Sequence, residues 1–275
     1  MPQGESEIPA ALPDPGLLLP VLSLARREIV RFFRQRNRVI GALLQPLIFW
    51  IFFGSAFRAS FKPPEGMEQM SYQEYFFPGT IVMILLFTAI FSTISIIEDR
   101  REGFLQSVLV APISRLAMVL GKILGGTFLA VFQGVLFLLL ALTMNIPFTL
   151  TSFFATLGVM CLVAVALTGL GFMIAWRMDS TQGFHAIMSI FLLPMWLLSG
   201  ALFPASGVPG WLGALMTINP LTYGLAALRH VMYPNAQFEH LPSLPLSLAV
   251  TAAFTVLVIA GSALLAGTRT SGDLH

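Results

Sequence analysis

The sequence predicts an all-α integral membrane protein with six transmembrane helices, and three observations lead to this fold class. The chain of 275 residues is 56% hydrophobic and only 10% charged, with a mean hydropathy of +0.84, whereas roughly a quarter of the residues in soluble domains are charged. The apolar residues form long runs, and the basic residues gather near the ends of those runs. The net charge is small, +2, and the basic residues lie where membrane topology requires them, so no nucleic-acid partner is implied.

Six apolar segments are long enough to cross a bilayer, which takes about 20 mostly apolar residues. The expected spans are residues 39–57, 76–97, 117–143, 152–175, 184–203 and 246–266, which together form a transmembrane domain from 39 to 266. A seventh apolar stretch, 207–230, is interrupted by Pro209, Gly210, Gly213 and Pro220. We expect this stretch not to cross the membrane as a plain helix.

The two ends of the chain lie outside this domain. Residues 1–20 begin MPQGESEIPAALPDPG and have no basic segment ahead of an apolar core, so we expect a disordered cytoplasmic tail and not a cleaved signal peptide. Residues 267–275 are expected to form a second cytoplasmic tail. The single cysteine, Cys161, lies in an apolar run and has no partner for an intrachain disulfide bond.

Residues 21–38 predict an amphipathic helix that lies in the membrane interface. Its apolar side holds Leu22, Ala25, Ile29 and Phe33, and its basic side holds Arg27, Arg31, Arg34 and Arg38. Such a helix places its apolar side in the acyl boundary and its arginines near anionic headgroups. The arginines either fix the topology alone or also contact a cytoplasmic partner, and the sequence leaves both possibilities open.

The distribution of Lys and Arg predicts the orientation. Six spans place both termini on one side, and basic residues favour the cytoplasmic side. With cytoplasmic termini, twelve basic residues lie inside: Arg26, Arg27, Arg31, Arg34, Arg36, Arg38, Arg100, Arg101, Arg115, Lys122, Arg177 and Arg269. Arg58, Lys62 and Arg229 remain outside. Both termini, and the loop between the second and third spans, are therefore expected in the cytoplasm.

That loop contains five adjacent charged residues, Glu98 to Glu102, in the stretch IIEDRREGFLQSVLVAPISR. Residues 98–110 predict a short amphipathic helix that ends before Pro112 and carries Phe104, Leu105, Val108 and Leu109 on one face. A Glu98–Arg101 pair would contribute only about 0.2–0.5 kcal/mol, so helix stability does not account for these charges. A docking surface with an apolar centre and a charged rim fits the composition, and so does a solvated loop.

The same stretch resembles a known family. EDRREGFLQSVLVAPISR, followed by Gly121-Lys122, is similar to the E-x-x-R-E-G-T-L-E-x-L-L-V-T-P-x-S-R pattern of type-2 ABC exporter permeases, the membrane subunits of many bacterial drug, antibiotic and polysaccharide exporters. LSGALFPASGVPGWLGALMTINPLTYGLAALR at 198–229 is similar to that family's signature between its fifth and sixth spans, and FFPGT at 76–80 is similar to the opening of its second span. The resemblance covers nearly the whole chain.

The resemblance implies that the loop between the second and third spans is a cytoplasmic coupling helix seated on a separate ATP-binding subunit. The positions that carry over are Glu98, Arg101, Glu102, Gly103, Pro112 and Arg115, with Gly121 and Lys122 behind them. The chain departs from the pattern at Phe104 and Gln106, where the family often has Thr and Glu. Phe104, with Leu105, would suit a hydrophobic knob that enters a cleft of the partner.

The resemblance also implies a homodimer or close heterodimer, with a translocation path between the second and fifth spans of the two protomers. We expect the path to be lined by Phe87, Phe91, Ser95, Met188, Phe191 and Met195. Residues 204–230 would form an outer re-entrant helical hairpin, because broken backbone is tolerated in a membrane only where protein or water covers it. This hairpin is marked by Pro204, Pro209, Trp211, Asn219, Pro220, Tyr223 and Arg229.

The sequence lacks the motifs of nucleotide hydrolases, intramembrane proteases and ion-coupled transporters. Gly121-Lys122 is not preceded by the glycine that a phosphate-binding loop needs, since Leu116 stands there. We therefore expect Lys122 to snorkel to the cytoplasmic interface, and we expect ATP and Mg on the partner subunit, with no cofactor or metal in this chain. The protease motifs H-E-x-x-H and G-x-S-x-G are absent. Only neutral polar side chains are expected deep in the spans, which argues against ion-coupled transport.

These features predict a permease subunit, not an enzyme, in the bacterial inner membrane. Its expected partners are two copies of an ATP-binding subunit, a second permease protomer and membrane lipid. An uncharged path favours export of a hydrophobic or amphipathic substrate by alternating access. Export of a lipid-linked glycan or lipid is an alternative, and a membrane assembly protein without transport activity is another.

Overall fold

The computed structural model describes residues 16–58, 61, 63, 70–111, 113–144, 146, 149–203, 208–234, 236 and 241–268, and in these ranges every regular element is a helix. The first helices are α1 (Leu18–Arg34), α2 (Arg36–Ala56), α3 (Tyr72–Ser92), α4 (Ile94–Arg101) and α5 (Phe104–Val110). They are followed by α6 (Arg115–Leu138), the 3-10 helix η1 (Leu139–Thr143), α7 (Leu150–Trp176), α8 (Thr181–Leu197), α9 (Gly210–Ile218), α10 (Pro220–Met232) and α11 (Leu244–Thr268). The all-α class predicted from the sequence is confirmed for the described residues.

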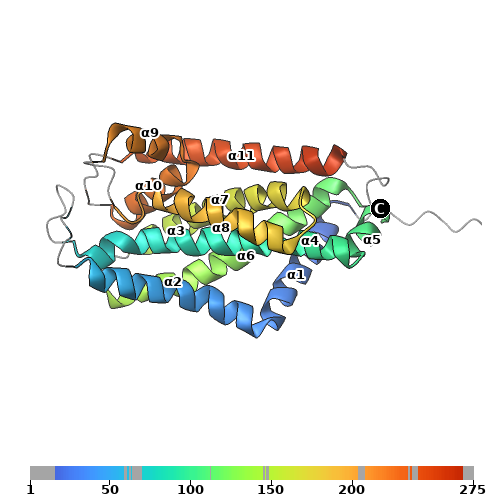
Figure 1. Cartoon of the computed structure of the whole chain (residues 1–275), viewed down its shortest axis with the longest axis horizontal. Helices are drawn as coiled ribbons and strands as arrows, with labels where there is room; N and C mark the ends of the chain where they lie inside the picture. The colour runs from blue at the N-terminus through green and yellow to red at the C-terminus, as the bar shows by residue number, and fades with distance from the viewer. Residues whose placement is uncertain are drawn as a thin grey trace, which may run out of the picture.

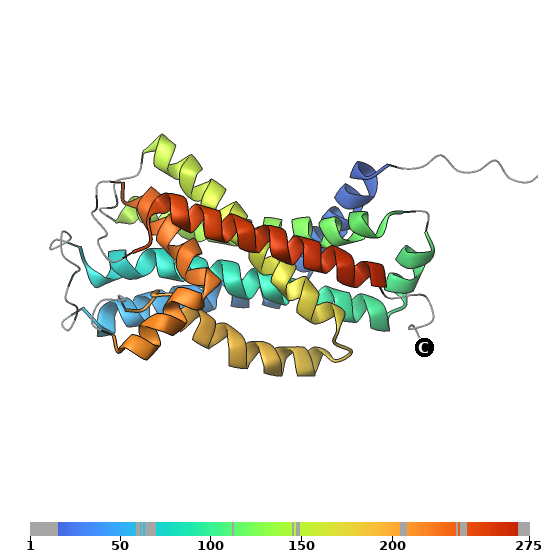
Figure 2. The same cartoon turned by 90° about the horizontal axis from the view of Figure 1, so that it is seen from above.

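The long helices run side by side along one axis, and the short helices lie at its two ends (Figure 1). At one end lie α4, α5 and the end of α11, and at the other end lies α9. The view from above shows the same separation of the two ends (Figure 2). The segments predicted to be cytoplasmic and the segments predicted to be outside therefore lie at opposite ends of the bundle.

Within the described ranges, five helical segments are long and apolar enough to cross a membrane. They are Val39–Ala56, Tyr72–Arg101, Arg115–Thr143, Leu150–Trp176 and Leu244–Gly267. The expected fifth span, 184–203, is instead the 17-residue helix α8, which ends at Leu197. The chain turns soon afterwards at Gly200, whose φ of 83° is a conformation that glycine adopts without steric cost. The chain is thus a multi-pass membrane protein, with one apolar helix shorter than predicted.

Helix α3 lies at the centre of the bundle and packs against α2, α6 and α7. Most of its side chains are buried, whereas few of the described side chains of α2 are. Pro78 within α3 has no N–H, so the carbonyl of Glu74 one turn earlier loses its helical partner. The Tyr233 hydroxyl donates a hydrogen bond of 2.7 Å to that carbonyl and so ties the end of α10 to α3. Burial raises the pKa of this hydroxyl, which keeps it a neutral donor.

Candidate functional site

The charged segment predicted to form one helix over residues 98–110 is two helices separated by a sharp turn. Helix α4 ends at Arg101, and Gly103 adopts a φ of 75° before α5 begins at Phe104. This left-handed conformation interrupts helical bonding and is easily adopted only by glycine. The prediction of a continuous amphipathic helix is therefore wrong, and Gly103 sets the direction of α5.

The apolar face of α5 points into the protein and not toward solvent. Leu105 is 2% exposed, and Phe104, Val108 and Leu109 pack against the core. Leu105 therefore cannot serve as an anchor for a partner in this conformation, which corrects the hydrophobic knob expected from the sequence. The outer face of α5 instead exposes Gln106, Ser107 and Val110, beside Glu102 in the preceding turn.

A buried ion cluster lies behind α5, where α1, α4 and α6 meet. It consists of Arg27, Glu28 and Arg31 from α1, Asp99 from α4 and Lys122 from α6. Asp99 is 0% and Lys122 5% exposed. The Lys122 ammonium contacts Asp99 and donates to Glu28 Oε1 at 2.6 Å and to Ser95 Oγ at 3.2 Å. The prediction that Lys122 snorkels to the membrane surface is wrong, because two carboxylates hold it inside the bundle.

The arginines of α1 complete this cluster. Arg27 donates both terminal nitrogens to the Asp99 carboxylate, at 2.9 and 2.8 Å, and its guanidinium lies 3.6 Å from the centre of the Phe104 ring. Arg31 lies 2.8 Å from both Asp99 and Glu98. Burial of Arg27 opposes its charge, but the hydrogen bonds and charge of Asp99 outweigh that effect and raise the pKa of Arg27. These two arginines thus bind carboxylates of α4, where the sequence had suggested lipid headgroups.

Close packing with α6 also holds α1 in place. A Cβ atom on Gly121 would lie 2.8 Å from Leu24 Cβ, and one on Gly125 would lie 2.8 Å from Glu28 Cβ. The two glycines are one helical turn apart, so together they make the flat strip on which α1 rests. Gly121, a position that the family pattern carries over, therefore has a packing role in this structure.

The other charged residues of the motif bind backbone carbonyls. Arg100 donates to Trp176 O at 2.6 Å and to Met178 O at 2.8 Å, and Arg101 donates to Asp179 O at 3.1 Å. Arg115 donates to the carbonyls of Ala266 and Gly267 near the end of α11, where a helix carries partial negative charge. Pro112 lies outside the described residues. The Glu98–Arg101 pair is not formed, because Glu98 pairs with Arg31.

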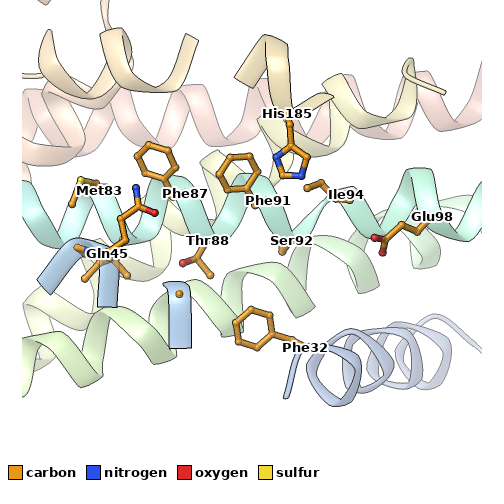
Figure 3. A pocket seen from close by; sticks show the side chains of 13 residues that line it. Phe32, Gln45, Met83, Phe87, Thr88, Phe91, Ser92, Ile94, Glu98 and His185 are labelled. Carbon is orange, nitrogen blue, oxygen red and sulfur yellow. The ribbon is translucent and has the colours of Figure 1, made fainter. Parts of the chain in front are cut away.

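A cavity of about 400 Å³ lies next to the ion cluster. Its lining comes from the end of α1, the first half of α2, α3, the start of α4 and α8, as Figure 3 shows. The lining residues are Phe32, Gly41, Gln45, Pro46, Met83, Ile84, Phe87, Thr88, Phe91, Ser92, Ile94, Glu98 and His185. The His185 ring lies against Phe91, with 5.1 Å between ring centres. An aromatic cavity with a few polar groups is the usual composition of a small-molecule site.

The structure brings only two of the six predicted path residues to this cavity. Phe87 and Phe91 line it, while Ser95 is buried beside Lys122. Met188 is 1% exposed, and Phe191 on the same helix is 65% exposed on the outer surface. Met195 lines a separate, much smaller space beside α7 and α10. The buried residues of α8, Phe184, Met188, Leu192 and Trp196, recur every four residues and form a narrow stripe. Phe191 lies outside this stripe and faces the surface.

The sequence analysis assigned Ser95 to the path but gave Thr88, Ser92 and Asp99 no role in a site, although a signal existed. Thr88, Ser92, Ser95 and Asp99 recur at intervals of four, three and four residues. This spacing places them on one side of a helix, and a polar stripe in an apolar span indicates a buried polar surface. The stripe leads from the cavity, at Thr88 and Ser92, to the ion cluster at Asp99. Glu28 and Phe32, on α1, gave no comparable signal.

At the opposite end, α9 and α10 form two short helices joined at Asn219. The Asn219 side chain accepts from the Leu221 N–H and donates to Met195 O at 2.6 Å, and Pro220 occupies the first turn of α10. Pro209 precedes α9, Trp211 is 69% exposed, and the Tyr223 hydroxyl donates to Thr217 O. Pro204 lies outside the described residues.

Arg229, on α10, is buried and fastens these helices to the rest of the bundle. It donates to Gly200 O at 2.9 Å, and its guanidinium lies 4.2 Å from the centre of the Tyr75 ring. The Tyr75 hydroxyl donates to the same carbonyl at 3.2 Å. The turn after α8 is therefore held from both α3 and α10.

Comparison with known proteins agrees with this architecture. Residues 20–233 match the family model described as ABC-2 type transporter. The chain is 28% identical over 212 residues to the ycf38 protein of Cyanophora paradoxa, covering 75% of this chain and 71% of that protein. It is 23% identical over 221 residues to the daunorubicin resistance ABC transporter permease protein DrrB1 of Streptomyces coeruleorubidus, covering 77% and 74%.

A third relative is the inner membrane transport permease YadH of Escherichia coli K12, which is 22% identical over 210 residues, covering 76% of this chain and 80% of that protein. The family model spans both the charged segment before α5 and the helices α9 and α10. Since the match extends over most of the chain, this protein belongs to the ABC-2 type transporter family and is the membrane subunit of an ABC transporter.

Proposed function

We propose that this chain is the permease of an ATP-driven exporter that moves a hydrophobic or amphipathic substrate outward across the membrane. Two protomers would alternate between inward-open and outward-open states, each bound to one of two ATP-binding subunits. In this arrangement α8 is the fifth of six spans in chain order, since its 17 residues extend about 26 Å, close to the thickness of the hydrocarbon core. Helices α9 and α10 form the outer re-entrant hairpin, and α5 is the coupling helix.

The distribution of charge supports cytoplasmic termini. Among the basic residues that the structure describes, only Arg58 and Arg229 belong to the end of the bundle with α9 and α10; Arg58 follows α2, and Arg229 lies within α10. The arginines of α1, α4 and the start of α6 gather at the opposite end (Figure 1). Positive charge favours the cytoplasmic face, so we expect the ATP-binding subunit to bind at the end of the bundle that contains α5.

The single observation that carries the substrate class is the cavity between α1, α2, α3 and α8. Aromatic and aliphatic side chains make most of its wall, and among the lining residues that the structure describes the only formally charged group, Glu98, is paired with Arg31. Such a wall favours an apolar body with a few hydrogen-bonding groups over a charged polymer. Polarizable Met83 and the Phe rings add a surface that tolerates differently shaped ligands. We therefore place hydrophobic and amphipathic molecules ahead of a lipid-linked glycan.

The proposed docking surface consists of Glu102, Gln106 and Val110. Gln106 and Val110 are one helical turn apart on the outer face of α5, and Val110 is 83% exposed. An exposed aliphatic side chain beside a charged residue fits a small interface with an apolar centre and a polar rim. This face replaces the Phe104 and Leu105 pair as the anchor for the ATP-binding subunit.

Substitutions on this face test the proposal. Val110→Asp should weaken co-purification of the ATP-binding subunit roughly thirtyfold, because a buried anchor contributes about 2 kcal/mol. Glu102→Lys should reduce binding further by reversing a rim charge. Membrane insertion should survive, since Val110 and Glu102 are both exposed and, among the described residues, the Glu102 side chain pairs only with Arg31, at 3.4 Å. Binding would be measured by titration of the purified ATP-binding subunit onto the permease in nanodiscs.

Val110→Leu is the matched control, because it keeps an apolar side chain at the same position and should bind as the parent does. Equal binding and equal substrate-stimulated ATP hydrolysis in the parent, Val110→Asp and Glu102→Lys would show that α5 does not dock the ATPase. A permease that confers no substrate-stimulated hydrolysis on any ATP-binding subunit would instead fit a membrane assembly protein without transport activity.

A further inference from the structure

The ion cluster is not needed to hold α1 against the bundle. Helix α1 already has an apolar face and two glycines of α6 on which to rest. Burying Asp99, Glu28 and Lys122 removes three charges from water, and such clusters are often no more stable than apolar side chains of similar size. Stability of the bundle is therefore a poor explanation for these residues.

The cluster joins α1 to both sides of the turn that precedes α5. Arg27 binds Asp99, four residues before Gly103, and covers Phe104, directly after it. Arg31 contacts Glu98 and Asp99, and lies 3.4 Å from Glu102. The backbone of α1 packs mainly on α6, so the connection from α1 to α4 and α5 consists of these long side chains. Paired guanidinium and carboxylate groups fix both distance and direction.

Helix α1 in turn continues directly into the wall of the cavity. It ends at Arg34, and α2 begins at Arg36, so the two helices form an elbow with one intervening residue. Phe32 lines the cavity before this elbow, and Gly41 and Gln45 line it after (Figure 3). A displacement of α1 would therefore move one wall of the cavity relative to α3.

We infer that the ion cluster is a positioning device that makes α1 move together with α5. A movement of the docked ATP-binding subunit then reaches the cavity by two routes, through α4 into α3 and through the ion cluster into the elbow of α1 and α2. This inference rests on the proposed function, because it needs an ATP-binding subunit seated on α5. The residues of the cluster act through α1 and touch no substrate.

A cysteine on the elbow can report this movement without knowledge of the substrate. The reporter is the full chain with Cys161→Ala and Gln45→Cys, reconstituted in nanodiscs with its ATP-binding subunit; Gln45 is exposed and lines the cavity. Alkylation by a small maleimide is timed without nucleotide and with ATP, Mg and vanadate. The parental rate should change about fivefold or more between the two states, the lower end of usual coupling between sites.

Two variants break the connection at different points. Arg31→Gln removes a cation that is 22% exposed, and Asp99→Asn removes the carboxylate that three cations share. Each should reduce the nucleotide-dependent change to within about twofold, while ATPase binding and ATP hydrolysis continue. Arg31→Lys should restore part of the change because it keeps the cation. If Asp99→Asn fails to fold, Arg31→Gln still carries the test.

Asp179→Asn is the matched control. Like Asp99→Asn, it removes a carboxylate that is paired with an arginine. Asp179, however, is exposed, and its partner Arg100 lies on α4 and not on α1. This variant should respond as the parent does. A parental response in both Arg31→Gln and Asp99→Asn would overturn the inference. So would an unresponsive reporter in a parental complex that hydrolyses ATP, whereas failure of any ATP-binding subunit to bind the parent would refute the proposed function itself.

Discussion

Single glycines determine how this bundle closes at its charged end. Gly103 allows the turn between α4 and α5, and Gly121 and Gly125 allow α1 to approach α6. Without these residues the arginines of α1 could not reach Asp99 in the same geometry. The charged side chains make the contacts of the site, but the distances between its helices depend on these glycines.

Gly121→Leu tests this dependence. The added side chain would begin 2.8 Å from Leu24 Cβ and 3.1 Å from Val21 O, so α1 must move away. Overpacking of this kind typically costs about 1–3 kcal/mol, and the loss of the ion pairs would add to it. The thermal midpoint of the detergent-solubilised protein should fall accordingly. Gly158→Leu, on α7 with nothing within 4 Å of the added Cβ, is the control and should leave the midpoint unchanged.

At the scale of the helix, length and anchoring distinguish the spans from the short helices α9 and α10. Helix α10 has 13 residues and extends about 20 Å, too little to cross a hydrocarbon core of about 30 Å. Arg229 and Tyr233 tie it to Gly200 and Glu74, near the same end of α3 and α8. Both observations favour a hairpin that enters and leaves on one side.

Cysteine labelling tests the hairpin. In a Cys161→Ala background, cysteines at Gly210 and Pro234, both exposed, should react with an impermeant maleimide added to intact cells. A cysteine at Ser107, exposed on α5, should react only after the membrane is permeabilised. Labelling of Gly210→Cys and Pro234→Cys from opposite sides would mean that α9 and α10 together cross the membrane. Labelling of Ser107→Cys in intact cells would invert the orientation.

At the scale of the whole molecule, the cavity connects the charged end of the bundle with its membrane-facing middle. The elbow of α1 and α2 stands beside α3, and the space between them is bounded on its far side by α8 (Figure 3). The polar stripe of Thr88, Ser92, Ser95 and Asp99 runs along one side of α3 and α4 from this space to the ion cluster. Under the proposed function, substrate contact and coupling would therefore be adjacent in one protomer.

A substitution that fills the cavity tests substrate binding without disturbing assembly of the permease with its ATP-binding subunit. Gly41→Trp adds a large ring at a lining position where nothing lies within 4 Å of the new Cβ. Stimulation of ATP hydrolysis by a panel of hydrophobic amines and neutral amphiphiles should then require at least about tenfold more compound, while basal hydrolysis persists. Gly158→Trp, equally open but outside the cavity, should behave as the parent does. Unchanged stimulation in Gly41→Trp would show that substrate binds elsewhere.

Much of this architecture follows from the sequence by itself. Apolar runs of sufficient length predict the spans because lipid requires every backbone group to be bonded within a helix. Five of the six predicted spans coincide with helices of spanning length. The prolines of 207–230 predict a broken segment, and the structure contains two short helices there. The charged motif at 98–102 identified the family, which the comparison confirms.

Only the tertiary structure decided which way each side chain faces. Leu105 and Lys122 were expected at surfaces, and both are buried. Lys122 is buried because α1 packs on α6 and supplies Glu28 as its partner. These contacts of α1 with α4 and α6 join residues about 70 to 95 positions apart in the chain. The spacing of apolar and charged residues within one helix cannot predict them. Periodicity fixes which residues share a face of one helix, whereas the choice of facing helix depends on close approach at Gly121 and Gly125 and on the matching of charges between helices.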